Sequence, residues 1–334
     1  MYDLHEIALS LVAPKKGLLA ADESIKTAGK RLATCGVEST AETRRQYREL
    51  FLDTPSIEKY LSGVILFEET LKQSSDSGVP FPELLEQKDI LPGIKVDQGT
   101  EPMSDSSKET VTKGLLDLEE RLAPYRASGA RFTKWRAVIR IDGDTLPSAK
   151  AIMENAKRLA SYALMAQQSG LVPILEPEVL LEGNHSRLRT KDVIETTMNA
   201  VFSAVDDIAV DRTALIIKTS MALSGSDSGR TDTPEEVADS TVEALKACIP
   251  ADVPGVVFLS GGQSPDQATN NLSAIMKLAQ KVGVPWNITF SYARALQSES
   301  LSVWKGEKDN VQNARAVFLE RLVKVTDALP DVTK

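Results

Sequence analysis

Eight short apolar or β-branched segments recur along the chain, separated by stretches long enough for amphipathic helices. Their ranges are 17–22, 62–67, 92–97, 132–139, 172–176, 214–218, 255–260 and 287–292. Residues 214–217 and 255–259 carry no charged or polar side chain, as expected of parallel strands that are covered on both faces. Eight strands that alternate with helices predict an α/β fold of the (β/α)8 TIM barrel type rather than an open doubly wound sheet.

The chain length and the helix signals favour one barrel domain over residues 1–334. Thr233, Pro234 and Glu236 combine an N-cap, a proline at the first helical position and a capping-box carboxylate directly after a predicted strand. The long connection at residues 25–61 is expected to be an insertion with extra helices. Extra helices are therefore expected near both ends of the chain.

The composition excludes several classes of partner. With 42% hydrophobic and 26% charged residues, the chain can bury a large core without disulfides or a structural metal. The formal net charge of -8 argues against nucleic acid and against an anionic membrane surface. Any phosphate site must therefore be a local cluster of lysine and arginine.

Sequence features near the N-terminus and the two cysteines indicate a cytoplasmic protein. The first residues lack the basic and apolar regions of a signal peptide and the Arg/Ser bias of a transit peptide. No apolar run approaches the roughly 20 residues that span a bilayer. Cys35 and Cys248 are too few for a disulfide framework and fit a reducing compartment.

Charged residues interrupt the apolar segments at their C-terminal ends, where barrel enzymes place their chemistry. They are Asp22, Lys95, Lys134, Arg136, Glu176, Glu178 and Lys218. The two-residue period of a strand puts Lys134 and Arg136 on one side of their strand, and Glu176 and Glu178 on one side of the next. Each could alone be a solvated strand end or a stabilising ion pair. Together, in one register, they favour an active site, because buried charge is costly without a use.

Lys218 is the best candidate nucleophile, because it follows four apolar residues and desolvation disfavours its ammonium form. Lys134 is the candidate for a neighbouring cation with the same effect. A neutral lysine attacks a ketone to form a carbinolamine and then an iminium, which accepts electrons during carbon–carbon cleavage. Glu176 can move the protons of that dehydration, and Asp22 can take a proton from a substrate hydroxyl.

Two cationic regions predict anion sites on either side of this lysine. Ser260, Gly261 and Gly262 lie ahead of a helix N-terminus after the seventh strand, and Arg294 follows the eighth; this is the usual phosphate site of such barrels. A Ser-Gly-Gly sequence alone would equally suit a turn. Lys95 and Arg136, together with Arg31, are expected to hold a second anion across the mouth. Two anion sites suggest a bisphosphorylated carbonyl substrate.

The histidine count is relevant to metal binding. His5 and His185 are the two histidines, and they lie far apart in sequence. A three-histidine zinc site of the kind used by metal-dependent aldolases therefore cannot be assembled from them. We expect no metal site and no cofactor.

Six motifs in one order resemble class I fructose-bisphosphate aldolases, and the similarity extends over about residues 10–320. They include Ala-Ala-Asp-Glu-Ser before residue 25 and Phe-Leu-Ser-Gly-Gly-Gln-Ser before residue 265, and occupy residues 18–24, 93–97, 134–136, 176–178, 258–264 and 291–297. The resemblance implies reversible cleavage of fructose 1,6-bisphosphate to dihydroxyacetone phosphate and glyceraldehyde 3-phosphate in glycolysis and gluconeogenesis. It also implies a cofactor-free Schiff-base mechanism and a homotetramer.

The resemblance also implies individual roles. Lys218 would form the Schiff base, Glu176 would be the main proton shuttle, and Asp22 would act at the C4 hydroxyl, with Lys134 and Glu178 in support. The residues implied at the C1 phosphate are Ser260, Gly261, Gly262, Ser291 and Arg294. Those implied toward the C6 phosphate are Ser24, Arg31, Lys95 and Arg136.

The sequence departs from the family pattern in three places. Thr219 and Ser220 follow Lys218, where animal members usually have Pro-Asn, and Ala293 replaces a common glycine. The sequence stops at Lys334, so we expect it to lack the family's tyrosine-ended tail, which assists proton transfer on the enamine. Water, Glu176 or Tyr292 are the candidates for that step.

Two other interpretations remain open from the sequence. A Schiff-base aldolase with another ketose substrate, such as fructose 1-phosphate or sedoheptulose 1,7-bisphosphate, would share the chemistry and differ at the second phosphate site. A barrel kept as a non-catalytic scaffold would be marked by loss of Lys218 or Glu176. Both residues are present.

Overall fold

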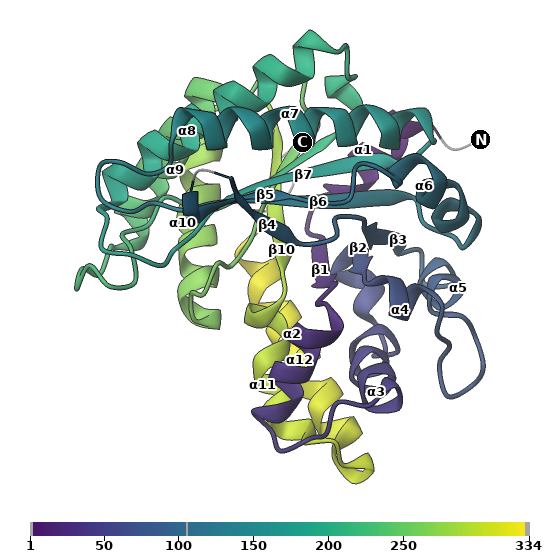
Figure 1. Ribbon diagram of the computed structural model, residues 1–334. Helices are drawn as coiled ribbons and strands as arrows, with labels where there is room; N and C mark the ends of the chain where they lie inside the picture. The colour runs from purple at the N-terminus through teal and green to yellow at the C-terminus, as the bar shows by residue number, and fades with distance from the viewer. Residues whose placement is uncertain (1–2, 105, 331–334) are drawn as a thin grey trace.

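The computed structural model describes residues 3–104 and 106–330 and contains a closed barrel of eight parallel strands (Figure 1). Each strand pairs with its neighbours along the chain, and the first pairs with the last. This confirms the (β/α)8 fold. The barrel strands are β1 (Gly17–Ala21), β2 (Leu61–Leu66), β3 (Leu91–Lys95), β6 (Phe132–Ile139), β7 (Val172–Val179), β8 (Ile216–Thr219), β9 (Gly255–Phe258) and β10 (Asn287–Tyr292).

Helices connect the strands and cover the outside of the barrel. The connecting helices are α4 (Glu68–Leu71), α5 (Phe81–Glu86), α6 (Leu118–Ala127), α7 (Ala149–Gln168), α8 (Arg187–Asp207), α9 (Pro234–Cys248), α10 (Pro265–Val282) and α11 (Arg294–Trp304). The extra helices expected from the sequence are α1 (Leu4–Leu11), α2 (Ile25–Ala33), α3 (Ala41–Leu52) and α12 (Val311–Asp327). Three short 3-10 turns complete the order: Ile57–Lys59, Arg212–Ala214 and Lys308–Asn310.

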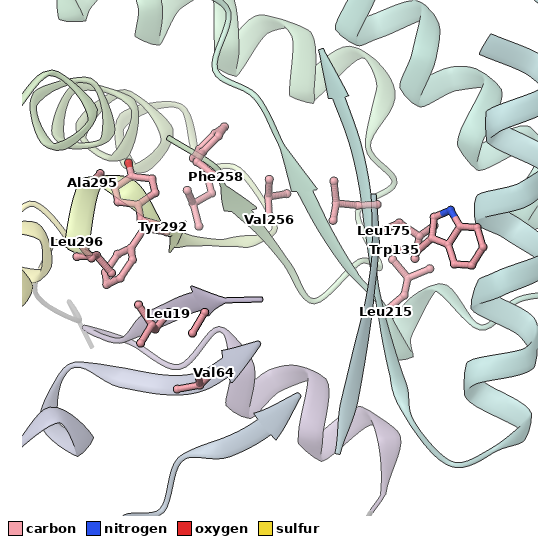
Figure 2. Close-up of a cluster of buried hydrophobic side chains, with 14 of the residues drawn as sticks. Leu19, Val64, Trp135, Leu175, Leu215, Val256, Phe258, Tyr292, Ala295 and Leu296 are labelled. Atoms are coloured by element: carbon pink, nitrogen blue, oxygen red, sulfur yellow. The ribbon is translucent and has the colours of Figure 1, made fainter. Parts of the chain in front are cut away.

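Alternation along each strand divides the apolar residues between two cores. Leu18 and Ala20 point into the barrel, whereas Leu19 and Ala21 pack against the surrounding helices. Figure 2 shows part of the outer core, with Tyr292 beside Ala295 and Leu296. The apolar face of α1 closes the N-terminal end of the barrel, so the opposite end is the open one.

Helices from distant parts of the chain lie side by side next to the barrel. Arg31 of α2 donates to Gln297 of α11 at 2.5 Å, and the two helices lie in the same region of Figure 1. Arg315 of α12 pairs with Asp53, directly after α3, at 2.8 Å. These helices form one wall around the C-terminal end of β1.

A two-stranded antiparallel hairpin, β4 (Thr100–Met103) and β5 (Ser106–Thr112), was not expected from the sequence. Its first strand, Thr-Glu-Pro-Met, is mostly exposed and contains Pro102, so it lacks the apolar alternation that predicts a strand. The hairpin joins the barrel where Thr112 donates to the carbonyl of Arg136 at 2.8 Å.

Cys35 and Cys248 are both free thiols. Over residues 3–104 and 106–330, no helix has the length and apolar character needed to cross a bilayer.

Candidate active site

The C-terminal ends of the strands surround a cavity of about 1020 Å³. Every site residue expected from the sequence lines it except Gly262, which directly follows the lining residue Gly261. The lining members are Asp22, Ser24, Arg31, Lys95, Lys134, Arg136, Glu176, Glu178, Lys218, Ser260, Gly261, Ser291 and Arg294. These expected residues come from seven of the eight predicted strand ends, and Phe67 at the end of the remaining one also lines the cavity.

Strand alternation explains why the central side chains point inward. Ile216 lies in the inner core, so Lys218, two residues later on β8, faces the same way. Phe132 and Lys134 on β6, and Ile174 and Glu176 on β7, follow the same rule. All three reactive side chains thus project from the inner core into the floor of the cavity.

Four charged groups form a continuous chain on this floor. The Nζ atom of Lys218 lies 3.0 Å from Oε1 of Glu176, and the Nζ atom of Lys134 lies 3.1 Å from Oε2. Lys134 also pairs with Asp22 at 2.6 Å. Two ammonium groups thus face two carboxylates, and Glu176 lies between Lys134 and Lys218 instead of the two lysines facing each other.

These contacts keep both carboxylates ionised. Burial would raise the pKa of Asp22, but the ammonium groups of Lys134 and Lys218 hold it well below its ordinary value. Burial opposes ionisation of Glu176 as well, and the same lysines, with Arg136, lower its pKa. For Lys134, burial is outweighed by Asp22 and Glu176, which raise its pKa. Lys134 is therefore a fixed cation.

One oxygen of Glu176 is available to a substrate. Oε2 is buried and makes no hydrogen bond within the described part of the chain, because Lys134 approaches it at ion-pair distance without suitable hydrogen-bond geometry. A buried acceptor that is ion-paired but makes no hydrogen bond is suited to bind a molecule in the cavity or to receive a proton from it.

Lys95 and Arg136 line a second part of the cavity, each beside its own carboxylate. Lys95 Nζ lies 2.6 Å from Oδ1 of Asp97 and donates to the Asp97 carbonyl at 2.7 Å. Arg136 pairs with Glu178. Burial disfavours the charge of Arg136, but Glu178 outweighs it and raises the pKa. Asp97 was not among the expected site residues, although it follows Lys95 at the same strand end.

The loop after β9 has the backbone conformation of an anion site. Gly261 and Gly262 have positive φ angles of 54° and 94°, which glycine adopts without strain. Gln263 is buried and donates to the Ser260 carbonyl at 3.0 Å, which closes the loop. Ser264 then caps α10 by accepting from the Gln267 amide at 3.2 Å. The loop therefore enters the helix with a fixed shape.

Ser291 and Arg294 complete this region from β10 and α11. The Oγ atom of Ser291 is buried, lines the cavity and has no hydrogen-bond partner among the described residues. Arg294 is exposed and makes no ion pair within residues 3–104 and 106–330. An unused donor and an uncompensated cation beside a glycine loop are suited to bind a phosphate.

Arg31 lines the same cavity as Lys95 and Arg136, and its polar contacts are with the end of β1, α3 and α11. It pairs with Glu23 and donates to Gln297 on α11 at 2.5 Å and to the Tyr47 hydroxyl at 3.3 Å. Tyr47 and Gln297 were missed because nothing in the sequence places α3 and α11 beside β1. Ser24 lies nearby as the N-cap of α2, where it accepts from the Thr27 amide at 3.3 Å.

Tyr292 points away from the cavity. Its hydroxyl donates to the Ala268 carbonyl at 3.0 Å, its side chain is fully buried, and burial raises its pKa. This geometry disfavours Tyr292 as the acid or base that the sequence had left open. In the described part of the chain, no three His, Cys, Asp or Glu side chains are grouped as a metal site.

Comparisons with known proteins agree on one family. The sequence profile described as fructose-bisphosphate aldolase class-I matches residues 3–331. Fructose-bisphosphate aldolase C of Rattus norvegicus is 47% identical over 96% of this chain and 87% of its own length. Cytosolic fructose-bisphosphate aldolase 5 of Arabidopsis thaliana is also 47% identical, over 98% of this chain and 90% of its own length.

A solved structure extends the comparison to the fold. The fructose-bisphosphate aldolase of Plasmodium falciparum, crystallised in complex with TRAP and a small-molecule inhibitor, superposes with a TM-score of 0.95. It is 42% identical, and the match covers 97% of this chain and 93% of that one.

Proposed function

Because this chain belongs to the class I fructose-bisphosphate aldolase family, we propose that Lys218 forms the Schiff base with the C2 carbonyl of the substrate. The enzyme cleaves fructose 1,6-bisphosphate reversibly to dihydroxyacetone phosphate and glyceraldehyde 3-phosphate, the aldolase step of glycolysis. One observation carries the assignment to Lys218: it is a buried lysine on the cavity floor, 3.0 Å from a carboxylate that can take its proton.

Glu176 moves the protons of Schiff-base formation. It takes a proton from Lys218, and the neutral amine then adds to C2 of the ketose to give a carbinolamine. Glu176 returns that proton to the carbinolamine hydroxyl, which leaves as water while the nitrogen lone pair forms the iminium. Its position between two lysines supports this role, because they keep the resting carboxylate ionised and ready to accept the first proton.

Asp22 starts the carbon–carbon cleavage. It removes the proton of the C4 hydroxyl, the C4 carbonyl forms, and the C3–C4 bonding electrons move into the iminium to give an enamine. Lys134 supports this step because its fixed charge keeps Asp22 ionised despite burial. Glu178 supports it indirectly by holding Arg136 beside the cavity.

The enamine is then protonated at C3, and water hydrolyses the resulting iminium to release dihydroxyacetone phosphate and regenerate Lys218. We assign delivery of this proton to Glu176, since Tyr292 lies outside the cavity. The proton that Asp22 took from the C4 hydroxyl reaches Glu176 through Lys134, which lies 2.6 Å from Asp22 and 3.1 Å from Oε2 of Glu176 and regains a proton from Asp22 as it gives one up. The same carboxylate thus serves both halves of the reaction.

The phosphates bind at opposite sides of Lys218. The C1 phosphate lies against the backbone amides of the β9 loop with charge from Arg294; the residues are Ser260, Gly261, Gly262, Ser291 and Arg294. The C6 phosphate lies toward Ser24, Arg31, Lys95 and Arg136. The uncompensated charge of Arg294 and the free hydroxyl of Ser291 support the first site most directly.

Three further properties belong to the same proposal. The reaction uses no metal and no other cofactor, so EDTA should leave activity unchanged. The protein is cytoplasmic, as the name of the Arabidopsis thaliana relative states for that protein. Residues 1–334 form one domain that assembles as a homotetramer. Size-exclusion chromatography with light scattering measures the molar mass of the assembly. The mass of a dimer or monomer would contradict the tetramer.

The test of the central assignment is reductive trapping. The protein is incubated with dihydroxyacetone phosphate, reduced with borohydride and analysed by peptide mass spectrometry. We expect an adduct on the peptide with Lys218 and none in Lys218→Ala, whereas Lys30→Met, which removes an exposed lysine at the cavity mouth, keeps it. An adduct on another lysine, or EDTA-sensitive cleavage with no adduct, would reject the assignment.

A further inference from the structure

A buried cluster of polar residues, which we call the Glu23 cluster, lies beside the cavity and consists of Glu23, Arg31, Tyr47, Arg48 and Gln297. Glu23 directly follows Asp22 at the end of β1. One of its carboxylate oxygens pairs with Arg31, and the other pairs with Arg48. Arg48 also donates to the Glu23 carbonyl at 2.8 Å. One carboxylate is therefore shared by two guanidinium groups.

The two arginines of the cluster differ in access to the cavity. Arg31 lines the cavity, and its side chain is 18% exposed. Arg48 does not line it; its side chain is 3% exposed and lies 5.1 Å from the centre of the Tyr47 ring. A ligand in the cavity can therefore contact Arg31 but not Arg48.

The charges around Arg31 do not cancel. Glu23 supplies one negative charge to Arg31 and Arg48, and Asp22 is already paired with Lys134. Arg294, exposed at the same wall, adds another positive charge. Burial and the charges of Arg48 and Arg294 lower the pKa of Arg31, although Tyr47 and Asp22 oppose this. Without Arg48, Glu23 would neutralise Arg31 alone.

We propose that Arg48 is a positioning residue for substrate binding. It pairs with one carboxylate oxygen of Glu23 and donates to the Glu23 backbone carbonyl. Arg31 therefore keeps an uncompensated positive charge for the substrate phosphate distal to the Schiff base. This inference rests on the proposed phosphate-binding role of Arg31. Arg48 touches no substrate and acts through Glu23 and Arg31. Its effect is therefore on phosphate affinity and not on bond cleavage.

The test compares a substrate that has this phosphate with one that lacks it. KM and kcat are measured for fructose 1,6-bisphosphate and fructose 1-phosphate with Arg48→Met, Arg48→Lys, Arg31→Met and the Arg31→Met/Arg48→Met double variant. We expect Arg48→Met to raise KM for the bisphosphate by about tenfold, with kcat within about twofold and little change for the monophosphate. Arg48→Lys keeps the charge and should restore most of the affinity.

The double variant tests the route of the effect. If Arg48 acts through Arg31, adding Arg48→Met to Arg31→Met should not raise KM further. Multiplicative effects, or equal losses of kcat on both substrates as expected from a general disturbance of Asp22, would overturn the proposal. Should Arg48→Met fail to fold by circular dichroism, a tenfold rise in KM with folded Arg48→Lys would overturn it, and near-normal KM would support it.

Borohydride trapping of dihydroxyacetone phosphate separates this proposal from the proposed function, because that ligand lacks the distal phosphate. Absence of an adduct in the unmodified enzyme would reject the role of Lys218. The role of Arg48 would then be decided by the KM measurements alone. A normal adduct with an unchanged bisphosphate KM in Arg31→Met would instead reject the Arg31 and Arg48 roles together.

Discussion

The Nζ atom of Lys218 lies 3.0 Å from Oε1 of Glu176, and each of the two side chains is only 4% exposed. A proton that leaves this lysine therefore has an immediate acceptor that water reaches poorly. The other oxygen of the same carboxylate makes no hydrogen bond among the described residues and can serve a substrate atom. Nucleophile and proton carrier are thus coupled in one buried pair.

Glu176→Gln should lower kcat by about 100-fold or more, because glutamine keeps the shape of the side chain and removes its proton-transfer capacity. Initial rates with fructose 1,6-bisphosphate measure the loss. Glu68→Gln is the matched control, since Glu68 also lines the cavity but pairs with Lys72 at the rim. A Glu176→Gln enzyme within about threefold of the control would contradict the shuttle role.

Lys134→Met should move the acid limb of the kcat/KM profile to higher pH. Burial raises the pKa of Asp22, and the charges of Lys134 and Lys218 lower it; removing Lys134 leaves burial less opposed, so the pKa rises. A rate profile from about pH 5 to pH 9 measures the shift. An acid limb that stays in place would show that Lys134 does not keep Asp22 ionised.

The same lysine controls acid stability. Because the folded pKa of Asp22 is depressed, its contribution to stability is complete above the unfolded value of about 3.9 and is lost as pH falls through the folded pKa. In Lys134→Met this loss should begin at higher pH. Circular dichroism during acid titration should show an unfolding midpoint at higher pH for Lys134→Met than for the unmodified protein. An unchanged midpoint would argue against coupling between Lys134 and the ionisation of Asp22.

Ser291→Ala and Ser300→Ala should have opposite consequences. The Ser291 hydroxyl is buried without a partner and lines the cavity, whereas the Ser300 hydroxyl donates to the Ala314 carbonyl at 2.7 Å. Ser300→Ala should cost about 1 kcal/mol of unfolding free energy and leave KM unchanged. Ser291→Ala should weaken competitive inhibition by inorganic phosphate and cost little stability. Urea titrations and inhibition constants distinguish the two patterns.

Gly261→Ala should weaken phosphate binding through backbone strain. Gly261 has φ of 54°, and an added Cβ would lie 3.0 Å from Cδ1 of Leu259. An alanine there costs about 1 kcal/mol or shifts the loop. Gly36→Ala is the control, with φ of 74° and open space around the added methyl. Both variants should lose stability, but only Gly261→Ala should raise KM; equal KM values would contradict the loop assignment.

The barrel was predictable because its strands carry a strong local signal. Segments such as residues 255–259 are continuous apolar runs, as expected of strands covered on both faces. The β4–β5 hairpin escaped prediction because it has no continuous apolar run and its first strand contains Pro102. The start of β8 was also placed two residues early, since residues 212–214 form a 3-10 turn.

The cavity floor was predictable for a related reason, since alternation fixes the direction of a side chain once its strand is known. Lys134 and Glu176 could be placed on neighbouring strands from strand order, and the structure brings them to 3.1 Å. Arg48 and Gln297 could not, because their helices reach the site through tertiary packing between distant segments. The outward direction of Tyr292 follows from the same alternation, since the preceding residue Ser291 lines the cavity, and α10 then accepts its hydroxyl hydrogen bond.

The inward direction of Lys134, Glu176 and Lys218 rests on their spacing from Phe132, Ile174 and Ile216, two residues earlier on each strand. One inserted or deleted residue between such a pair would turn the reactive group into the helix-facing core. Evolution can therefore lengthen the loops at the mouth or exchange their residues, but each of these strands can change only by substitution. We therefore expect insertions and deletions to be much rarer in these strands than in the loops that select the substrate.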